Sequence, residues 1–311
     1  MFDSLSTIEN VRLNFSEGGL LFMNITLAFI MFGVSLEIKI QNFKEIFYKP
    51  KAAIIGITSQ FIMLPALAFV LVMIINPPPS VAMGMILIAA CPGGNISNFI
   101  SSLAKANVAL SVGLTAFATL SASLFTPLNF AFWGSIYVHS FSKAAELNIP
   151  IELSFLQMAK TVFILLGIPL ILGMWFSRKF PKITKKVLKP IKTGSIIFYL
   201  IFIAGALYAN LKFVPLVIVP LTIIVLLLNF ETVFSGFIMS TIFRLSKADR
   251  RTVSIETGIQ NSGLALVLIF NPLLFNGNGG MAFTAAWWGI IQMITGLLLA
   301  LALSKMRQVI V

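Results

Sequence analysis

The sequence contains few charged residues for its length. Only 10% of its 311 residues are Asp, Glu, Lys or Arg, whereas soluble domains carry about 25%. Hydrophobic residues make up 58%, and the mean hydropathy is +0.99. A soluble fold could not hide so much apolar surface from water, so this composition excludes an ordinary soluble domain and points to a membrane.

Cysteine and histidine are nearly absent, with one residue of each, Cys91 and His139. A single cysteine excludes a disulfide within the chain and argues against a thiolate metal site, and we expect Cys91 to be a small packing residue. No HExxH spacing and no Ser-His-acid arrangement occurs in the sequence. The sequence therefore predicts a protein that is not an enzyme.

Acidic residues are outnumbered, because 10 Asp and Glu stand against 22 Lys and Arg, giving a net charge of +12. In a soluble protein such an excess would favour nucleic-acid binding. Here the basic residues lie between apolar runs, as the orientation of membrane proteins requires. We therefore expect the lipid bilayer to be the surrounding partner, and the sequence indicates neither nucleic acid nor an obligate protein partner.

Long apolar runs, each near the ~20 residues that cross a bilayer, recur along the whole chain. They predict an all-α integral membrane protein that forms a single transporter domain over residues 1–311. The nine predicted transmembrane helices cover residues 18–36, 52–75, 81–104, 108–138, 153–176, 194–211, 213–243, 252–275 and 280–304.

Basic residues are distributed unevenly between the predicted loops. They gather in segments 37–51, 177–193 and 244–251, while the alternate loops hold only Arg12, Lys143 and Lys212. Under the positive-inside rule, the more basic segments are cytoplasmic. We therefore predict a multi-pass protein of the plasma membrane (the inner membrane in a bacterium) with the N-terminus outside and the C-terminus in the cytoplasm.

The order of the predicted helices is that of an inverted repeat. Residues 18–138 and 194–304 would each supply four helices, and the linking helix at 153–176 makes corresponding helices run in opposite directions. The third helix of each half is interrupted by polar and glycine residues, at 91–98 (CPGGNISN) and 256–263 (ETGIQNSG). One interruption alone could be a structural kink, but two at matching positions predict discontinuous helices that cross at a binding site in the membrane.

Glu256 lies beside the second interruption, where an isolated carboxylate is costly unless it is protonated, paired or bound to a cation. Gln260 follows four residues later, and Ser111 and Thr115 have the same spacing. With Ser97, Asn98 and Gln60, these residues offer oxygen ligands that suit a hard cation. The alternative for any one hydroxyl residue is helix-to-helix hydrogen bonding.

The strings CPGGNISN at 91–98, NVALSVGLT at 107–115 and ETGIQNSGLAL at 256–266 resemble the bile acid:sodium symporter family, and IMFGVSL at 30–36 extends the likeness. This resemblance implies a core domain that contains the two crossing helices, a panel domain that moves against it, and two sodium ions.

The resemblance also implies which residues hold each ion. The first sodium site would contain Ser97, Asn98, Ser111, Thr115 and Glu256. The second would contain Gln60, Glu256 and Gln260, together with the backbone carbonyls of Thr257 and Ile259.

The substrate is expected near the crossing, at Asn95, Asn261 and Gln292. Asn95 stands where several members of the resembled family have Thr, and Gln292-Met293 replaces a His-Asn pair of some members. These differences leave the sodium ligands intact and bear on which organic anion is bound.

We therefore expect a sodium-coupled symporter that takes up an organic anion by alternating access, either a bile acid or a small carboxylate such as pantoate. One alternative is a cation/proton antiporter of similar fold, although its usual intramembrane aspartates are missing, because Asp3 and Asp249 lie outside the apolar runs. Another is a non-transporting membrane receptor, which would not need two broken helices. Lys160 and Glu231 both fall within predicted helices and could pair with each other or lie near a membrane boundary.

Overall fold

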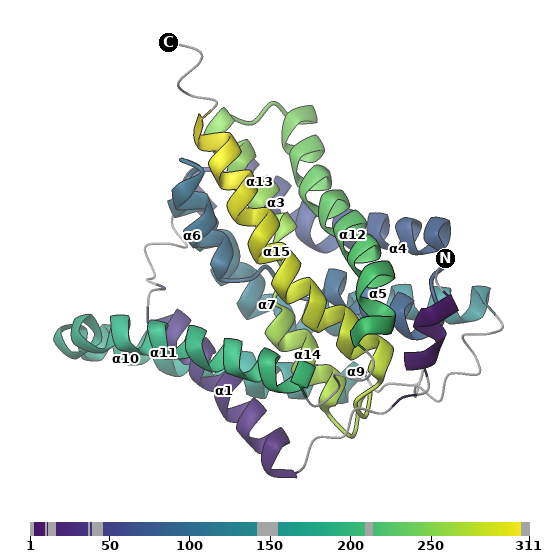
Figure 1. The fold of residues 1–311 in the computed structure, drawn as a ribbon. Helices are drawn as coiled ribbons and strands as arrows, with labels where there is room; N and C mark the ends of the chain where they lie inside the picture. Colours follow the sequence, from purple (N-terminus) through teal and green to yellow (C-terminus); the bar gives the residue numbers. More distant parts are fainter. Residues whose placement is uncertain are drawn as a thin grey trace.

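The computed structural model describes residues 3–9, 11, 17–36, 38, 46–141, 155–208 and 214–305. Within these residues the regular elements are helices, and one isolated pair of residues is bridged as in a sheet (Figure 1). The predicted all-α architecture is confirmed for this part of the chain. The helices are η1 (Asp3–Ile8), α1 (Glu17–Ser35), α3 (Pro50–Thr58), η2 (Ser59–Met63), α4 (Leu64–Ile75), α5 (Pro79–Ala90), α6 (Ile96–Leu103), α7 (Val108–Ser140), α9 (Phe155–Val162), η3 (Phe163–Gly167), α10 (Ile168–Lys179), α11 (Pro181–Tyr208), α12 (Val214–Ile242), α13 (Lys247–Gly258), α14 (Ser262–Phe270) and α15 (Gly279–Lys305).

Five continuous helices of the described residues are long and apolar enough to cross a membrane. They are Pro50–Ile75, Val108–Ser140, Leu156–Lys179, Val214–Ile242 and Gly279–Lys305. Each coincides with a predicted transmembrane helix. The other four predicted helices correspond to α1, α11 and the interrupted pairs α5/α6 and α13/α14, which are shorter, broken or partly polar.

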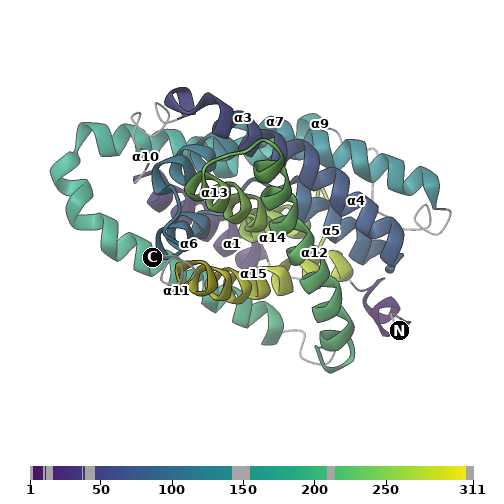
Figure 2. The ribbon, with the colours of Figure 1, turned by 90° about the horizontal axis from the view of Figure 1, so that it is seen from above.

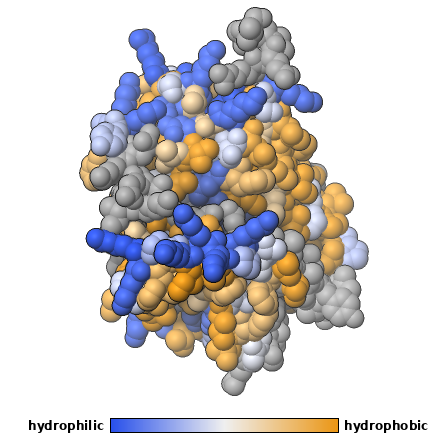
Figure 3. Space-filling view, turned by 90° about the vertical axis from the view of Figure 1, so that its left-hand side faces the viewer, coloured by the Kyte–Doolittle hydropathy of each residue, from blue (hydrophilic) through white to orange (hydrophobic). Residues whose placement is uncertain are grey.

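The sixth predicted helix begins earlier than expected. The apolar run suggested a start at residue 194, but α11 begins at Pro181 and continues through several lysines. Proline fits the first turn of a helix, and the exposed lysines that follow are good helix formers, although they lower the hydropathy. The segment expected as a basic loop is therefore two helix ends that meet at Phe180. Figure 3, viewed from the side where α10 and α11 meet, shows hydrophilic side chains gathered over this face.

Two helices contain π-helical turns, η2 and η3, and in each a proline, Pro65 or Pro169, lies two residues after the last residue of the turn. Proline lacks the N–H that would continue the α-helical bonding pattern, so a wider turn at this point is physically reasonable. The first of these turns contains Ser59 and Gln60, both buried. It thereby presents two polar side chains to the interior of the bundle.

The helices form an inner bundle with a smaller group beside it. Figure 2 shows α13 and α14 surrounded by α3, α7, α12 and α15. Nearly every residue of α5 and α14 is buried. By contrast, α1 packs mainly on α10 and α11, and it meets the inner bundle at α14. Large apolar side chains lie exposed on both groups, for example Ile201 and Phe230, as expected of helices that face lipid.

Lys160 and Glu231 do not pair. Lys160 is exposed, and both carboxylate oxygens of Glu231 are buried without a hydrogen-bond partner among the residues that the structure describes. Of the two alternatives left open by the sequence, pairing of these two residues is therefore excluded in this conformation.

Candidate functional site

The two interrupted helices meet where their helical hydrogen bonding stops. The segment between α5 and α6 runs antiparallel to the segment between α13 and α14, bridged at Gly93 and Gln260. The Gly94 N–H donates to the Ile259 carbonyl (2.7 Å), and the Asn261 N–H donates to the Pro92 carbonyl (2.9 Å). These bonds satisfy backbone groups that lipid could not satisfy. The expected crossing of discontinuous helices is thus present.

Gly93 and Gly94 are required by the closeness of this crossing. A Cβ atom at Gly93 would lie 2.7 Å from Oε1 of Glu256, and one at Gly94 would lie 2.9 Å from the Gln260 carbonyl oxygen. Both distances are shorter than Cβ atoms normally show, so a side chain at Gly93 would displace the carboxylate and one at Gly94 would displace the backbone. Glycine at both positions lets the first interruption approach the second backbone and the buried carboxylate without such shifts.

The five residues predicted for the first sodium site lie together, and we call them the Glu256 group. Glu256, from α13, is 3% exposed. Its Oε2 accepts hydrogen bonds from Ser97 of α6 (2.7 Å) and Ser111 of α7 (3.0 Å), and its Oε1 accepts one from Thr115 of α7 (2.6 Å). The side-chain oxygen of Asn98 lies 2.9 Å from the Ser111 hydroxyl and 3.2 Å from that of Thr115.

The Glu256 group contains more acceptor oxygens than protons to fill them. A hydroxyl carries one proton, yet the Thr115 hydroxyl faces the Glu256 carboxylate, the Asn98 side-chain oxygen and the Ser111 carbonyl oxygen. Among the described residues, no ion pair involves Glu256. A bound hard cation would supply the missing positive charge, so the donor set fits such an ion.

The residues predicted for the second sodium site form an amide pair beside the first. The Gln60 side-chain amide donates to Oε1 of Gln260 (2.7 Å) and to the Cys91 carbonyl (3.2 Å), and the Gln260 side-chain amide donates to the Thr257 carbonyl (2.7 Å). The Ile259 carbonyl is engaged by Gly94. All these residues meet at the crossing, but in this conformation N–H groups occupy the oxygens of Gln260, Thr257 and Ile259, and hydroxyl groups occupy those of Glu256.

The three predicted substrate residues differ in how their amides are used. Asn95 precedes α6 without capping it, and its side-chain oxygen is buried without a partner among the described residues. Asn261 caps α14 by accepting from the Leu264 N–H (3.0 Å), and its amide nitrogen lies 3.9 Å from the Met31 sulfur of α1. Gln292 bonds to both the N–H and the carbonyl of Gln260 (2.8 and 3.0 Å). Asn95 therefore has the most unused hydrogen-bonding capacity.

Sequence reasoning missed several polar residues around the site. The Ser59 hydroxyl lies 3.0 Å from that of Thr257, and the Asn229 amide donates to the Gly258 carbonyl (3.2 Å), where α13 ends. Asn229 was detectable as a single amide within an apolar run. Ser59 had no such signal, since serine is common where helices pack in membranes.

A second missed cluster, which we call the Asp249 clamp, lies at the beginning of α13. Asp249 accepts from Lys49 (3.1 and 3.2 Å), from the Asn107 amide (2.7 Å) and from the Ser246 hydroxyl (2.8 Å). Partial burial raises the pKa of the Asp249 carboxyl, but these hydrogen bonds and the Lys49 charge outweigh burial, so the pKa lies below its usual value. The clamp joins the beginnings of α7 and α13, which carry Ser111, Thr115 and Glu256.

A sequence profile of the sodium bile acid symporter family matches residues 24–215. The uncharacterized sodium-dependent transporter YocS of Bacillus subtilis is 30% identical over 287 residues, 91% of this chain and 83% of the relative. The probable sodium/metabolite cotransporter BASS1, chloroplastic, of Arabidopsis thaliana is 30% identical over 279 residues, 89% of this chain and 65% of the relative.

Mammalian proteins are also similar to this chain. The human sodium-dependent organic anion transporter is 24% identical over 280 residues, 89% of this chain and 71% of the relative. The mouse P3 protein is 30% identical over 275 residues, 86% of this chain, but the chain spans only 55% of its length. The match thus extends over most of this chain in each case.

Proposed function

The chain belongs to the sodium bile acid symporter family, and on this premise we propose that it is a secondary symporter that moves an organic anion across a membrane together with sodium. The observation that carries the proposal is the Glu256 group: a buried carboxylate surrounded by hydroxyl and amide oxygens and paired with no basic side chain among the described residues. The relatives' names, which include sodium-dependent and sodium/metabolite transporters, support the same function.

The first sodium ion is proposed to bind within the Glu256 group. The hydroxyl groups of Ser97, Ser111 and Thr115 now donate to the carboxylate. Each hydroxyl can rotate and present a lone pair to an ion instead. The Asn98 oxygen already faces the same space from α6. Binding would therefore need rotation of hydroxyl groups and little movement of the helices.

The second sodium ion is proposed to bind between Gln60, Glu256 and Gln260 and the carbonyls of Thr257 and Ile259. Here the ligands must rearrange, because the Gln260 amide nitrogen occupies the Thr257 carbonyl. A half-turn of that amide would exchange its nitrogen for its oxygen and remove the competing donor. This proposal makes the second site the more dependent on conformation.

The organic anion is proposed to bind beside the crossing. There α6 and α14 both begin, at Ile96 and Ser262, and helix N-termini carry partial positive charge. Turned by half a rotation, the unpartnered Asn95 amide would offer N–H groups to an anion, and Asn261 lies where α14 approaches Met31 of α1. A contact from Gln292 would have to replace one of its bonds to Gln260.

Nine membrane-spanning helices are proposed, in two inverted halves (residues 18–138 and 194–304) joined by the linking helix at 153–176. The antiparallel pairing of the two interruptions supports this symmetry. The group formed by α1, α10 and α11 would act as the panel domain, and its motion against the inner bundle would expose the site to each side in turn. Its contacts with that bundle are made at α14 and, through α9 and η3, which are continuous with α10, at α7, so the proposed motion would take place across these contacts.

The N-terminus is proposed to lie outside and the C-terminus in the cytoplasm. Lys49 and Asp249 belong to two of the basic segments, and their ion pair (3.1 Å) supports placing both on one side of the membrane. Lys143, on the opposite side, lies outside the described residues. Cysteines introduced at Lys143 and Lys186 should react with an impermeant reagent from opposite sides of the membrane. Native Cys91 is fully buried and should not react with the reagent. Labelling of both from one face would overturn this orientation.

The proposed stoichiometry makes transport electrogenic. One negative charge on Glu256, two sodium ions and a monovalent anion sum to zero, so the loaded site suits a low-dielectric crossing. Each cycle would carry one net positive charge inward, which an inside-negative potential of 100 mV favours by about 2.3 kcal/mol.

Uptake by purified protein in proteoliposomes tests the proposal. A panel of labelled bile acids and small carboxylates, including pantoate, should show at least one anion whose uptake needs an inward sodium gradient and accelerates with an inside-negative potential. Exchange of sodium for protons by the same proteoliposomes, without any organic anion, would instead favour the cation/proton antiporter alternative. A rate indifferent to potential would contradict two-sodium coupling for a monovalent anion.

A further inference from the structure

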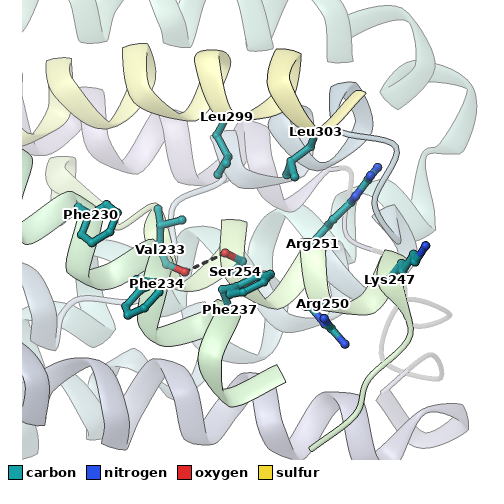
Figure 4. A pocket seen from close by; sticks show the side chains of 10 residues that line it. All are labelled: Phe230, Val233, Phe234, Phe237, Lys247, Arg250, Arg251, Ser254, Leu299 and Leu303. Atoms are coloured by element: carbon teal, nitrogen blue, oxygen red, sulfur yellow. Dashed lines mark hydrogen bonds between the residues drawn. The ribbon is translucent and has the colours of Figure 1, made fainter. Parts of the chain in front are cut away.

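A groove on the outside of the inner bundle differs in character from the sodium site. It encloses about 340 Å³ between α12, α13 and α15, within the range of ligand-binding pockets. Figure 4 shows three aromatic side chains of α12 along one end and three basic side chains of α13 at the other. We call this feature the α12–α13 groove.

The aromatic end of the groove is open and apolar. Phe230, Phe234 and Phe237 are 67%, 46% and 45% exposed, and the rings of Phe230 and Phe234 stack with centroids 5.5 Å apart. Leu299 of α15 forms the opposite wall. The Ser254 hydroxyl, a polar group of the wall, is already satisfied by the Val233 carbonyl (2.8 Å), as the dashed line in Figure 4 shows. The aromatic end is therefore suited to contact a hydrocarbon chain.

The basic end has positive charge without matching acid. Lys247, Arg250 and Arg251 lie in the first turns of α13, and none of the described residues that line the groove is acidic. The neighbouring carboxylate, Asp249, is engaged by Lys49. Arg251 donates to the Ala104 carbonyl (2.8 Å) and Arg250 approaches the Leu245 carbonyl (3.5 Å), but these acceptors are neutral and leave the charge unmatched. The charge of this end is therefore available to an anionic ligand.

The Arg250 guanidinium carries a second indication of a ligand. It lies over the Phe237 ring, with Cζ 5.7 Å from the ring centroid. Its Nε–H is buried and has no hydrogen-bond partner among the described residues. A buried N–H without an acceptor is costly, and a phosphate oxygen is the acceptor that guanidinium groups bind best.

The positions of the aromatic and basic ends of the groove relative to the ends of the helices indicate the chemical class of the ligand. α12 ends at Ile242 and α13 begins at Lys247, so the cations lie at helix ends, while Phe230 lies deeper in a helix long enough to cross the membrane. From Phe237 to Phe230 the helix rises about 10 Å. A phospholipid has the same order, with its phosphate at the membrane boundary and its acyl chain inside.

We propose that the α12–α13 groove binds an anionic phospholipid, with its phosphate at Arg250 and Lys247 and an acyl chain against Phe230 and Phe234. A free phosphate ion would leave the aromatic wall uncovered, and a neutral lipid would leave the positive charge unmatched. The assignment depends on the membrane setting of α12 and not on sodium coupling, so the two proposals can fail separately.

Native mass spectrometry of the purified, delipidated protein tests this site. Phosphatidylglycerol and phosphatidylcholine with identical acyl chains are offered at equal concentration, with excess glycerol phosphate in a parallel sample. We expect phosphatidylglycerol to be retained preferentially and glycerol phosphate not to displace it. Equal retention of the two lipids, or displacement by glycerol phosphate, would overturn the proposal without any variant.

Variants then test whether the preference for phosphatidylglycerol arises at the α12–α13 groove. Lys247→Gln combined with Arg250→Gln should weaken the preference for phosphatidylglycerol by about an order of magnitude. Lys182→Gln combined with Lys185→Gln removes the same charge from exposed positions on α11 and should leave the preference unchanged. Phe230→Ala should weaken retention of both lipids. If the α11 variant lowers the preference as much as the α13 variant, the binding is diffuse surface attraction and the groove is not the site.

Discussion

Two acidic residues on the same helix, Asp249 and Glu256, lie about two turns apart on α13 and are treated in opposite ways. Asp249 is held by the ammonium group of Lys49 and by two further donors. Glu256 is more deeply placed between helices, and its partners are hydroxyl groups without charge. A permanent partner makes a carboxylate structural, whereas a carboxylate supplied only with neutral ligands can accept a cation that comes and goes.

The sharpest test of this comparison is Glu256→Ala. The variant should fold but lose sodium-dependent uptake by about a hundredfold or more, because removing one partner of a buried charge interaction costs about 3–5 kcal/mol. Uptake in proteoliposomes containing equal amounts of folded protein measures the effect. Full sodium-driven uptake by this variant would remove Glu256 from the site.

Gly93→Ala tests the same carboxylate without touching it. The added methyl group would lie 2.7 Å from Oε1 of Glu256 and must displace it. We expect the sodium concentration for half-maximal uptake to rise by about tenfold, in line with small misplacements at binding sites. Gly18→Ala is the matched control, since a Cβ there meets nothing within 4 Å. An unchanged sodium dependence in Gly93→Ala would mean that the carboxylate does not bind the ion.

Gln260→Ala should have a smaller effect on sodium. It removes one neutral oxygen from the proposed second site and leaves the Glu256 group complete. A neutral ligand contributes about 0.5–1.5 kcal/mol net, so the half-saturating sodium concentration should rise several-fold. A loss as severe as that of Glu256→Ala would show that the two sites cannot be separated in this way.

Asp249→Asn should leave sodium dependence unchanged and lower stability instead. Lys49 is 42% exposed, so the loss of the ion pair and its hydrogen bonds should cost about 1–2 kcal/mol in a thermal melt. The pKa of Asp249 is lowered by folding, so its contribution is complete above the ordinary pKa of about 3.9 and is lost as pH falls through the lowered value. In the variant, the free energy of unfolding should therefore decrease less steeply as the pH falls through this acid range. A changed sodium affinity would contradict the division of roles.

Much of the fold could be predicted from hydropathy. The apolar runs located the five long helices to within a few residues, and Pro92 with the glycines beside it located the first interruption. The beginning of α11 was missed because a lysine-rich turn lowers hydropathy without opposing a helix. Hydropathy reports the surroundings of a segment and only indirectly its backbone conformation.

The candidate site was predictable only in part. Family motifs brought together Ser97, Ser111 and Glu256, which the structure places in one hydrogen-bonded group. The Asp249 clamp could not be foreseen, because Lys49 is separated from Asp249 by most of the chain and looked like any other loop lysine. The different uses of Asn95 and Asn261 also depend on tertiary geometry, since both residues precede a helix and are equally suited to cap it.

The backbone pairing between the two interruptions has a mechanical consequence. Two backbone bonds, from Gly94 to Ile259 and from Asn261 to Pro92, join the interrupted helices at their midpoints, in addition to the hydrogen bond from Ser97 to Glu256. These bonds resist a change in the angle between the two interrupted helices. The two helices should therefore move together as one rigid body. Relative motion of the helices must then occur at the borders of this body, and one such border is the contact between Asn261, at the beginning of α14, and Met31 of α1.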